Sequence, residues 1–145
     1  KEYYQNPEAT AEAIKDGWLY TGDIATIDED GYFYIVDRKK DVVISGGENV
    51  YPAEVENVLL THPKVFEAAV IGTPDDKWGE RVTAIVKLKP GQEINKEELM
   101  DWCKEQFPSY KCPRRIEFGD LPRSPTNKIL KSELRLKYAG SESAF

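Results

Sequence analysis

Residues 37–56 read Asp-Arg-Lys-Lys-Asp-Val-Val-Ile-Ser-Gly-Gly-Glu-Asn-Val-Tyr-Pro-Ala-Glu-Val-Glu, and this stretch decides how the chain is organised. Its four consecutive charged residues, 38–41, cannot lie unpaired in a core, so they predict an exposed joint between two packed units. The apolar run 42–44 predicts a short buried strand that ends at Gly46 and Gly47. Because adjacent glycines accept positive φ and carry no side chain, they predict a turn whose backbone is open to a ligand. An ordinary tight turn is the alternative for this pair.

A helix is expected directly after the glycines, over residues 51–60. Pro52 suits its first turn, where the missing N–H would have no partner in any case. Glu54 and Glu56 complement the positive end of the helix dipole. The predicted order is therefore joint, strand, open glycine turn and helix.

The residues before the joint, 1–37, predict one short helix and a β-hairpin. Asn6 can cap a helix that begins at Pro7 and stops at Gly17. Strands are expected at 18–20, 24–27 and 32–36, with a hairpin turn at 28–31. This segment has too little apolar bulk to fold alone, and the sequence begins without an initiating Met. We therefore expect residues 1–37 to be the tail of a larger domain.

The residues after the joint predict a compact α+β unit. Strands are expected at 65–72, 81–88 and 115–118, a loop at 73–80, and helices at 95–107, capped by Asn95, and at 132–138. Alternating helices and strands with non-sequential pairing indicate a small mixed sheet with packed helices. We take residues 38–41 as a hinge, 42–139 as an independent domain, and 140–145 as a frayed tail.

Composition excludes several classes of protein. The 145 residues carry a net charge of −6 and are 40% hydrophobic, which argues against a general nucleic-acid binder and against disorder. No apolar run approaches the ~20 residues of a membrane span, and no signal peptide is evident. Residues 108–137 nevertheless hold eight basic and three acidic groups. This basic segment indicates a phosphate-rich partner or, alternatively, a solvated face.

The cysteines and the single histidine do not indicate a metal or catalytic site. Cys103 and Cys112 show no Cys-x-x-Cys spacing, and reduced thiols in a cytoplasmic protein are the simplest account. His62 precedes Pro63 at the predicted end of a helix. Because no serine, cysteine or carboxylate constellation surrounds it, we assign His62 to ending the helix.

Three stretches, in this order and spacing, resemble motifs of the adenylate-forming acyl-CoA synthetases, the superfamily that also holds luciferases and peptide-synthetase adenylation domains. They are Tyr-Thr-Gly-Asp at 20–23, the stretch 37–56, and Pro-Arg-Ser-Pro-Thr-Asn-Lys at 122–128. The resemblance extends from Tyr3 to about Tyr138. It implies that the α+β unit is the mobile C-terminal domain of such an enzyme, and that residues 1–37 end its N-terminal domain.

The resemblance also implies roles in adenylation. Lys128 occupies the position of the family's catalytic lysine, and a positioned cation suits the negative charge that builds on the α-phosphate and the attacking carboxylate. Asn127 stands where the family usually has Gly, and Asn also tolerates a left-handed backbone. Asp23 and Arg38 match residues that bind the ribose and phosphate of the nucleotide. Lys40 matches the hinge position.

Roles in binding CoA are implied for a second group of residues. In the pose used for thioester formation, Gly46, Gly47 and Glu48 would line the pantetheine channel. An aromatic residue at Trp78, another at Tyr110, and cations after it hold the CoA nucleotide in some relatives. This chain has Cys112 where such relatives can carry Arg, so Arg114 is the cation we assign, with Lys111 or Arg115 nearby. Trp78 as a plug within its own loop is the alternative.

The implied function is that of an ATP-dependent acid:CoA ligase. Such an enzyme activates a carboxylic acid, here a fatty or aromatic one, as acyl-AMP and transfers it to CoA. ATP, CoA and Mg²⁺ are the implied cofactors, with the magnesium ligands expected in the N-terminal domain, which is the implied protein partner. Two alternatives remain: an adenylating enzyme with a carrier-protein or other acceptor, and a non-enzymatic interaction module that uses the basic segment.

Overall fold

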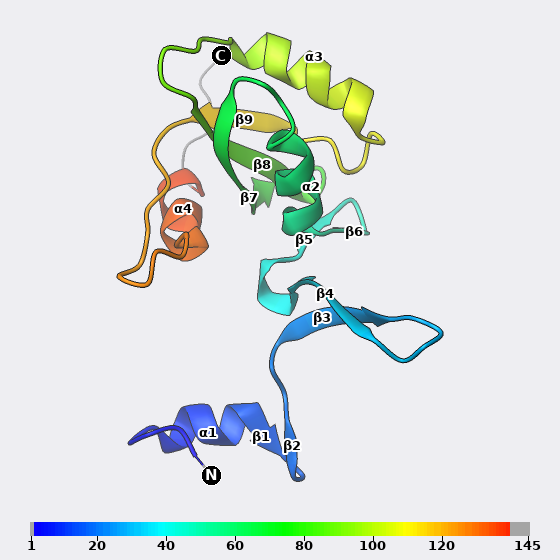
Figure 1. Cartoon of the computed structure of the whole chain (residues 1–145), viewed down its shortest axis with the longest axis vertical. Coiled ribbons are helices and arrows are strands. Elements are labelled where there is room, and N and C mark those ends of the chain that lie inside the picture. The colour runs from blue at the N-terminus through cyan, green and yellow to red at the C-terminus, as the bar shows by residue number, and fades with distance from the viewer. Residues whose placement is uncertain (1, 140–145) are drawn as a thin grey trace. The chain divides into compact units, whose positions relative to one another are not determined.

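The structure is a computed structural model, and it describes residues 2–139 (Figure 1). The predicted frayed tail, residues 140–145, lies outside the described part. The internal contacts of the chain define two compact units, one up to Lys40 and the other from Asp41.

The first unit begins with a short helix and a small strand pair. Helix α1 (Pro7–Ala13) starts as predicted, with the Asn6 side chain accepting a backbone N–H of its first turn at 3.0 Å. The chain then turns at Gly17, whose φ is +82°. Across this turn β1 (Ile14–Lys15) pairs with β2 (Trp18–Leu19), which shortens the predicted helix and adds a strand that the sequence pattern did not predict.

The first unit continues with the predicted hairpin, formed by β3 (Asp23–Ile27) and β4 (Phe33–Arg38). Gly31 in its turn has a φ of +86°, a conformation that glycine adopts without steric strain. Large apolar side chains of the hairpin, among them Phe33 and Ile35, are more than 60% exposed. The unit therefore buries little apolar surface of its own.

The second unit comes after the 3-10 turn η1 (Lys39–Asp41), and its described residues form five strands and three helices. In chain order they are β5 (Val43–Ser45), β6 (Glu48–Val50), α2 (Pro52–Leu59), β7 (Val65–Asp75), β8 (Gly79–Leu88), α3 (Lys96–Gln106), β9 (Arg115–Phe118) and α4 (Lys131–Tyr138).

The sheet of the second unit is mixed, and the α+β prediction is confirmed. Its strands have the order β6-β5-β8-β7, and β9 pairs with β8 as well. The β8–β9 pair is parallel, whereas the others are antiparallel. Strand β8 is the central strand of this sheet, because β5, β7 and β9 all pair with it, and β7 lies at the edge.

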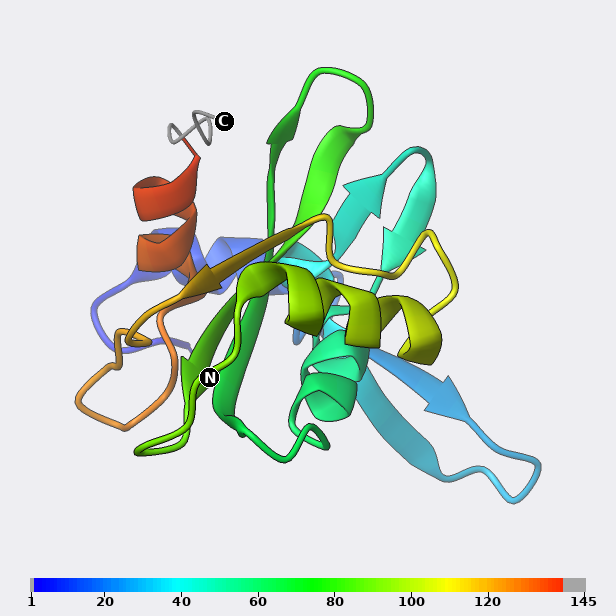
Figure 2. The same ribbon diagram turned by 90° about the horizontal axis from the view of Figure 1, so that it is seen from above.

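The core lies on both faces of the β7–β8 hairpin, because successive side chains of a strand point to opposite faces. Ala68 and Val70 of β7 pack in the cluster that includes residues of α2 and α3. Ala69 and Ile71 pack in a second cluster with residues of α4. The sheet is thus a middle layer, with α2 and α3 on one face and α4 on the other (Figures 1 and 2).

Two predictions near the glycines were wrong in detail. A strand, β6, lies between the glycine turn and the helix, so Gly46 and Gly47 form the two-residue loop of a β-hairpin. Their φ values, +60° and +87°, are those of a type I′ turn, which matches the twist of the flanking strands. The run 42–44 is also not uniformly buried: Val43 faces the core, whereas Ile44 is 56% exposed, as strand alternation requires.

The prediction of a loop at 73–80 was also wrong, because β7 and β8 continue through most of these residues. Pro74 pairs with Glu80 in the ladder, and the turn is confined to residues 76–78. Proline removes a backbone donor, but β7 lies at the edge of the sheet, where that donor has no neighbouring strand to meet.

Candidate functional site

The candidate residues of the second unit gather at two opposite ends of the β7–β8 hairpin. At one end, Ser45 beside the glycine turn pairs with Gly79. At the other end, Arg123 of the loop that carries Lys128 binds Glu67. The two attachment points, Glu67 and Asp75 opposite Gly79, are eight strand residues apart, or roughly 26 Å at the ~3.3 Å rise of a strand. Figure 2 shows the loop and the glycine turn at these separate ends of the sheet, which we call the lysine end and the glycine end.

The loop at the lysine end is held by polar contacts. Arg123 donates to the backbone oxygen of Asn127 at 2.6 Å and also binds the Glu67 carboxylate. The Ser124 hydroxyl accepts the backbone N–H of Lys128 at 3.2 Å, and the Ser124 N–H donates to the Lys128 oxygen at 2.8 Å. The Asn127–Lys128 peptide is therefore held at both its oxygen and its N–H, and the Lys128 oxygen is held as well.

The residue before Lys128 adopts the conformation that the sequence predicted. Asn127 has a φ of +64°, in the left-handed region that Gly usually occupies and that Asn tolerates. Its N–H donates to the Ser124 oxygen at 2.8 Å, which closes a tight turn. Asn at this position therefore keeps the turn that places Lys128 at the loop tip.

Lys128 differs from most of the other cations of the basic segment, residues 108–137. Five of those cations are neutralised by carboxylates: Lys111 by Glu54, Arg115 by Glu117, Arg123 by Glu67, Lys131 by Glu56 and Arg135 by Asp41. Within residues 2–139, the exposed Lys128 ammonium makes no ion pair. The basic segment is therefore not a continuous cationic surface, and the cation left unmatched on the loop 122–128 is the residue that the motif singles out.

The glycine end is built from two turns in direct contact. The N–H of Gly46 donates to the backbone oxygen of Trp78 at 2.9 Å. A Cβ at Gly46 would lie 2.6 Å from Cε3 of the Trp78 ring, closer than real Cβ contacts. The indole therefore packs directly on the bare backbone of the glycine turn. Beside it, Gly47 has open space where a side chain would be, and Glu48 is exposed at the start of β6.

Arg114 completes the glycine end. Its guanidinium carbon lies 4.3 Å from the centroid of the Trp78 ring, and the Lys77 ammonium lies 4.9 Å from it. Arg114 is itself placed by its backbone N–H, which donates to the oxygen of Val82 in β8 at 2.9 Å. Gly46, Trp78 and Arg114, which the sequence assigned separately, therefore form one contiguous group. The indole is half-buried between the glycine turn and the Arg114 guanidinium.

Tyr110, with the adjacent Lys111, is the remaining candidate for contact with CoA. Tyr110 is 39% exposed, and its ring is 5.6 Å from the Lys111 ammonium. Because Lys111 binds Glu54 at 2.6 Å, its charge is already matched. A cavity of about 440 Å³ borders Arg114, and Cys112, Lys104 and Met100 also line it.

The turn that carries Trp78 is held by Asp75. Its carboxylate accepts the backbone N–H groups of Lys77 and Trp78, both at 3.0 Å. The hydrogen bond from Trp78 is the main reason that the pKa of Asp75 lies below its ordinary value. The carboxylate is therefore ionised at neutral pH and keeps the turn closed.

Asp23 and Arg38 lie together in the first unit. They face each other across the β3–β4 ladder, and Arg38 Nε is 3.5 Å from Asp23 Oδ1. The Arg38 side chain is 57% exposed, so water weakens this pair. Asp23 is oriented by the Thr21 hydroxyl, which accepts its N–H at 3.1 Å.

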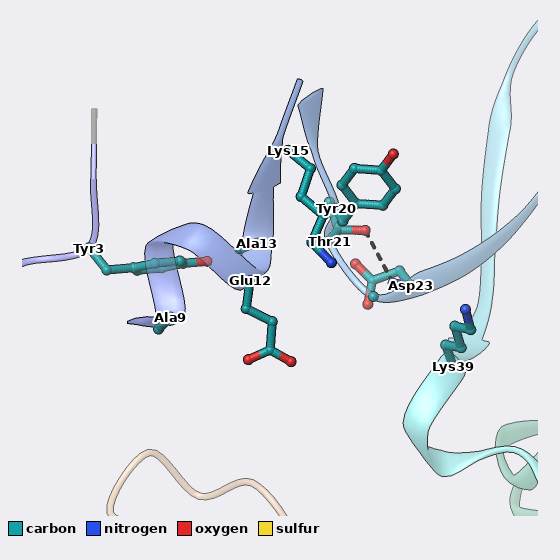
Figure 3. Close-up of a pocket in the computed structure, with 10 residues that line it drawn as sticks. Tyr3, Ala9, Glu12, Ala13, Lys15, Tyr20, Thr21, Asp23 and Lys39 are labelled. Atoms are coloured by element: carbon teal, nitrogen blue, oxygen red, sulfur yellow. Dashed lines mark hydrogen bonds between the residues drawn. The ribbon is translucent and has the colours of Figure 1, made fainter. Parts of the chain in front are cut away.

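Two hollows border these residues. Figure 3 shows the larger, about 700 Å³, in which Asp23, Thr21 and Lys39 lie opposite side chains of α1. A second hollow of about 590 Å³ is lined by Thr21 and Gly22 together with three consecutive cations, residues 38–40. Lys40 is thus exposed within η1, next to a surface suited to anionic groups.

The remaining polar candidates have structural surroundings. His62 is buried, its Nδ1 accepts the N–H of Lys64 at 3.2 Å, and its ring meets Trp102 edge-on. Desolvation, with the charges of Lys64 and Lys89, lowers the pKa of His62. Cys103 and Cys112 are free and buried, and burial raises the pKa of Cys103 to about 12.

Metal-binding and membrane-spanning features are both missing from the described part of the chain. Across residues 2–139, no group of three or more His, Cys, Asp or Glu side chains is placed to hold a metal ion. None of the helices described there has the length and apolar character of a membrane span.

Sequence reasoning missed two residues at the glycine end. Glu80 accepts the N–H of Ile44 at 2.8 Å, and Gly72 lies directly beneath the Glu80 carboxylate. No local pattern signals this contact, because Ile44 and Glu80 are 36 positions apart. The only hint in the sequence is a glycine, Gly72, at the end of an apolar run.

Known proteins match this chain along nearly its whole length. The model of the family described as "AMP-binding enzyme C-terminal domain" matches residues 54–128. A feruloyl-CoA synthase of Amycolatopsis sp. is 51% identical over 139 residues, which are 95% of this chain and 28% of that protein. The fatty acid–[acyl-carrier-protein] ligase ScoC of Streptomyces coeruleorubidus is 50% identical over 98% of this chain and 28% of its own length.

A solved structure agrees with these matches in sequence. The ATP-bound structure of MatB from Rhodopseudomonas palustris aligns with a TM-score of 0.88 at 40% identity, over 97% of this chain and 28% of MatB. The chain thus spans about 28% of the length of these proteins.

Proposed function

The chain belongs to the AMP-binding enzyme C-terminal domain family, and on this premise we propose that it is part of an ATP-dependent acid:CoA ligase. The enzyme would join a carboxylic acid to ATP, releasing pyrophosphate and forming acyl-AMP. The thiol of CoA would then attack the acyl carbon and expel AMP. The acid we propose is fatty or aromatic, a class to which the substrate named for the feruloyl-CoA synthase belongs.

The observation that carries this proposal is the separation of the two ends of the β7–β8 hairpin. Adenylation needs a cation that meets negative charge developing on phosphate and carboxylate. Thioester formation needs a narrow path for a thiol arm. The lysine end offers an unpaired ammonium on a fixed loop, and the glycine end offers bare backbone beside an indole. A domain with these two ends could present first Lys128 and then the glycine turn to the same cleft, one for each of the two reactions.

We propose Lys128 as the catalytic residue of adenylation. Its ammonium would neutralise the charge that builds on the α-phosphate as the acid attacks. Asp23 and Arg38 would hold the nucleotide, with the Asp23 carboxylate accepting ribose hydroxyls and the Arg38 guanidinium donating to ribose or phosphate. Their exposed mutual ion pair costs little to exchange for these contacts.

For the second step we propose that Gly46, Gly47 and Glu48 line the path of the pantetheine arm. Arg114 would bind a phosphate of CoA, and Trp78 and Tyr110 would contact its adenine. Arg114 now stacks on Trp78, so a nucleotide would approach a cation and an indole already in place.

In the proposed enzyme, each range of this chain would belong to a different structural part. Residues 1–37 would end the N-terminal domain, residues 38–41 would form the hinge, and 42–139 would be the lobe that swings. Lys40 would absorb the backbone rotation. The N-terminal domain would be the partner of this lobe, and it would supply the acid pocket and the magnesium ligands.

Metal chemistry and location complete the proposal. We place the magnesium ligands in the N-terminal domain and propose no step in which this lobe holds Mg²⁺. We propose a cytoplasmic location, where ATP and CoA are available.

A second candidate is an adenylating enzyme whose acceptor is a carrier protein. The similarity to ScoC, named as a fatty acid–[acyl-carrier-protein] ligase, favours it. The two acceptors present the same pantetheine thiol, and they differ in the group that the pantetheine is attached to. CoA carries a phosphorylated adenosine, for which the Trp78 and Arg114 pair is suited, whereas a carrier protein brings a folded surface. The geometry at the glycine end therefore favours CoA.

The test is an assay of the full-length enzyme with a panel of fatty and aromatic acids. We expect ATP-dependent AMP release that requires both an acid and CoA, and lower efficiency with pantetheine or a carrier protein as acceptor. Residues 1–145 alone should give no turnover, because most of the nucleotide cleft is expected in the N-terminal domain. Robust turnover by this segment, or full activity without any thiol acceptor, would contradict the proposal.

A further inference from the structure

Few backbone hydrogen bonds join strand β5 and the glycine turn to strand β8. Strand β5 pairs with β8 at a single position, Ser45 opposite Gly79. One further backbone bond joins Gly46 to Trp78. The next backbone donor along β5, the N–H of Ile44, binds the Glu80 carboxylate at 2.8 Å instead of a strand carbonyl. A side chain of β8 thus takes the place of a ladder hydrogen bond.

The Glu80 carboxylate occupies a space that another glycine keeps open. A Cβ built on Gly72 would lie 2.5 Å from Oε1 and 2.8 Å from Cδ of Glu80. The φ of Gly72 is not in the left-handed region, so its backbone would accept any residue. Gly72 is therefore required by the position of Glu80 and not by a turn.

A comparison with Glu56 shows that Glu80 is not a standard structural carboxylate. Glu56 also accepts a strand N–H, that of Val70 at 2.7 Å, but it is neutralised by Lys131 at 2.8 Å. Within residues 2–139, Glu80 is half-buried and makes no ion pair. Its charge strengthens the single bond to Ile44, since a charged acceptor binds an N–H more strongly than a neutral one.

We infer that Glu80, seated over Gly72, is a positioning residue for thioester formation: it holds β5 so that the Gly46 and Gly47 turn stays in register with Trp78. This rests on the proposed function, in which that turn lines the path of the pantetheine arm. Glu80 acts through Ile44 and does not need to touch CoA. Its loss should therefore lower the rate of thiol attack and leave adenylation, which uses the lysine end, nearly intact.

The experiment separates the two half-reactions in the full-length enzyme. Adenylation is measured by exchange of labelled pyrophosphate into ATP, and thioester formation by mixing enzyme, acyl-adenylate and CoA. For Glu80→Ala we expect exchange within about 2-fold of wild type and thioester formation about 10- to 100-fold slower, as about 1 Å of misplacement implies. The loss should fall mainly on kcat and not on the KM for CoA.

Four further variants test the geometry. Glu80→Gln keeps an acceptor oxygen at the same reach and should restore most of the rate. Gly72→Ala should reproduce the Glu80→Ala defect, because its Cβ displaces the carboxylate. In the double variant Gly72→Ala/Glu80→Ala, the carboxylate is gone and the methyl group of Ala at position 72 has room. Its loss in the rate of thioester formation should therefore not exceed that of the worse single variant. Glu56→Ala is the matched control, and we expect it to lower the melting temperature without a selective loss of thioester formation.

Several outcomes would overturn the inference. Equal losses in both half-reactions, Gly72→Ala at wild-type rates, or the same selective defect in Glu56→Ala would each do so. If Glu80→Ala does not fold, Glu80→Asp replaces it in the test. The Asp carboxylate is one methylene shorter and cannot reach the N–H of Ile44. This variant should therefore show the same selective loss of thioester formation, in a milder form. A wild-type enzyme that forms no acyl-adenylate would instead contradict the proposed function.

Discussion

The lysine end and the glycine end of the β7–β8 hairpin expose opposite kinds of feature. At the lysine end, side chains clamp backbone: Arg123 and Ser124 fix the peptides around Lys128, and one charge is left unpaired. At the glycine end, the backbone itself is the exposed feature, and an indole packs where side chains are missing. A group that acts by charge needs a fixed direction, whereas a channel for a thiol arm needs room. Under the proposed function, the same sheet would supply both, because its two ends are far apart.

The sharpest way to test this contrast is to remove the charge at the lysine end. In the full-length enzyme, Lys128→Ala should slow adenylation by about 10³-fold, the loss typical of removing one preorganised group that stabilises charge. Thioester formation from supplied acyl-adenylate should stay within about 3-fold. Pyrophosphate exchange measures the adenylation rate, and a single-turnover assay with acyl-adenylate and CoA measures the rate of thioester formation.

Lys137→Ala is the control for Lys128→Ala, because Lys137 is an exposed cation of the same basic segment on α4. It should leave both half-reactions unchanged. A Lys128→Ala enzyme with normal adenylation would exclude the catalytic role and revive the interpretation as a non-enzymatic interaction module.

The complementary change fills the space at the glycine end. Gly46→Ala combines a positive φ with a Cβ 2.6 Å from the Trp78 ring, so either the turn or the indole must move. We expect thioester formation to fall about 10- to 100-fold, since a shift near 1 Å has this effect, while adenylation changes little.

Gly91→Ala is the matched control for backbone strain. Gly91 also has a positive φ, +73°, but open space where its Cβ would be. It should reduce the melting temperature slightly and affect neither half-reaction selectively. If Gly46→Ala slowed adenylation as much as thioester formation, the assignment of adenylation to the lysine end and thioester formation to the glycine end would be wrong.

A smaller effect is expected from the cation that stacks on Trp78. Arg114→Ala should raise the KM for CoA about 5- to 30-fold, the equivalent of about 1–2 kcal/mol of cation–π and phosphate contact. With pantetheine as acceptor, which lacks the nucleotide, wild type and variant should be alike. A variant impaired equally with both thiols, or one impaired only with a carrier protein, would count against the assignment of Arg114 to CoA.

The sequence predicted the parts of the site whose signals are local. Asn127 was expected to accept a left-handed backbone and does so, and the caps Asn6 and Asn95 begin their helices as predicted. The α+β class could be inferred from the alternation of apolar runs. Each of these depends on residues close together in the chain, where propensity and steric rules act directly.

The sequence did not predict what depends on distant residues. Strand β6 was hidden because Glu48 and Asn49 are polar, and only pairing with β5 makes them a strand. A loop was expected at 73–80, but β7 continues through Pro74, which is tolerated because β7 lies at the edge of the sheet. The contact of Glu80 with Ile44 joins elements 36 positions apart, so only the fold could reveal it.

The least disruptive change at the lysine end tests whether its geometry, and not the identity of each residue, matters. Asn127→Gly should leave adenylation within about 2-fold, because glycine adopts a φ of +64° freely. Asn127→Val should slow it several-fold, since a β-branched residue disfavours this conformation and would turn the Lys128 peptide out of the Arg123 clamp. Thioester formation should be equal in both variants. If Asn127→Val adenylated at the wild-type rate, the fixed direction of Lys128 would be unimportant, and the contrast between a clamped end and an open end would reduce to charge alone.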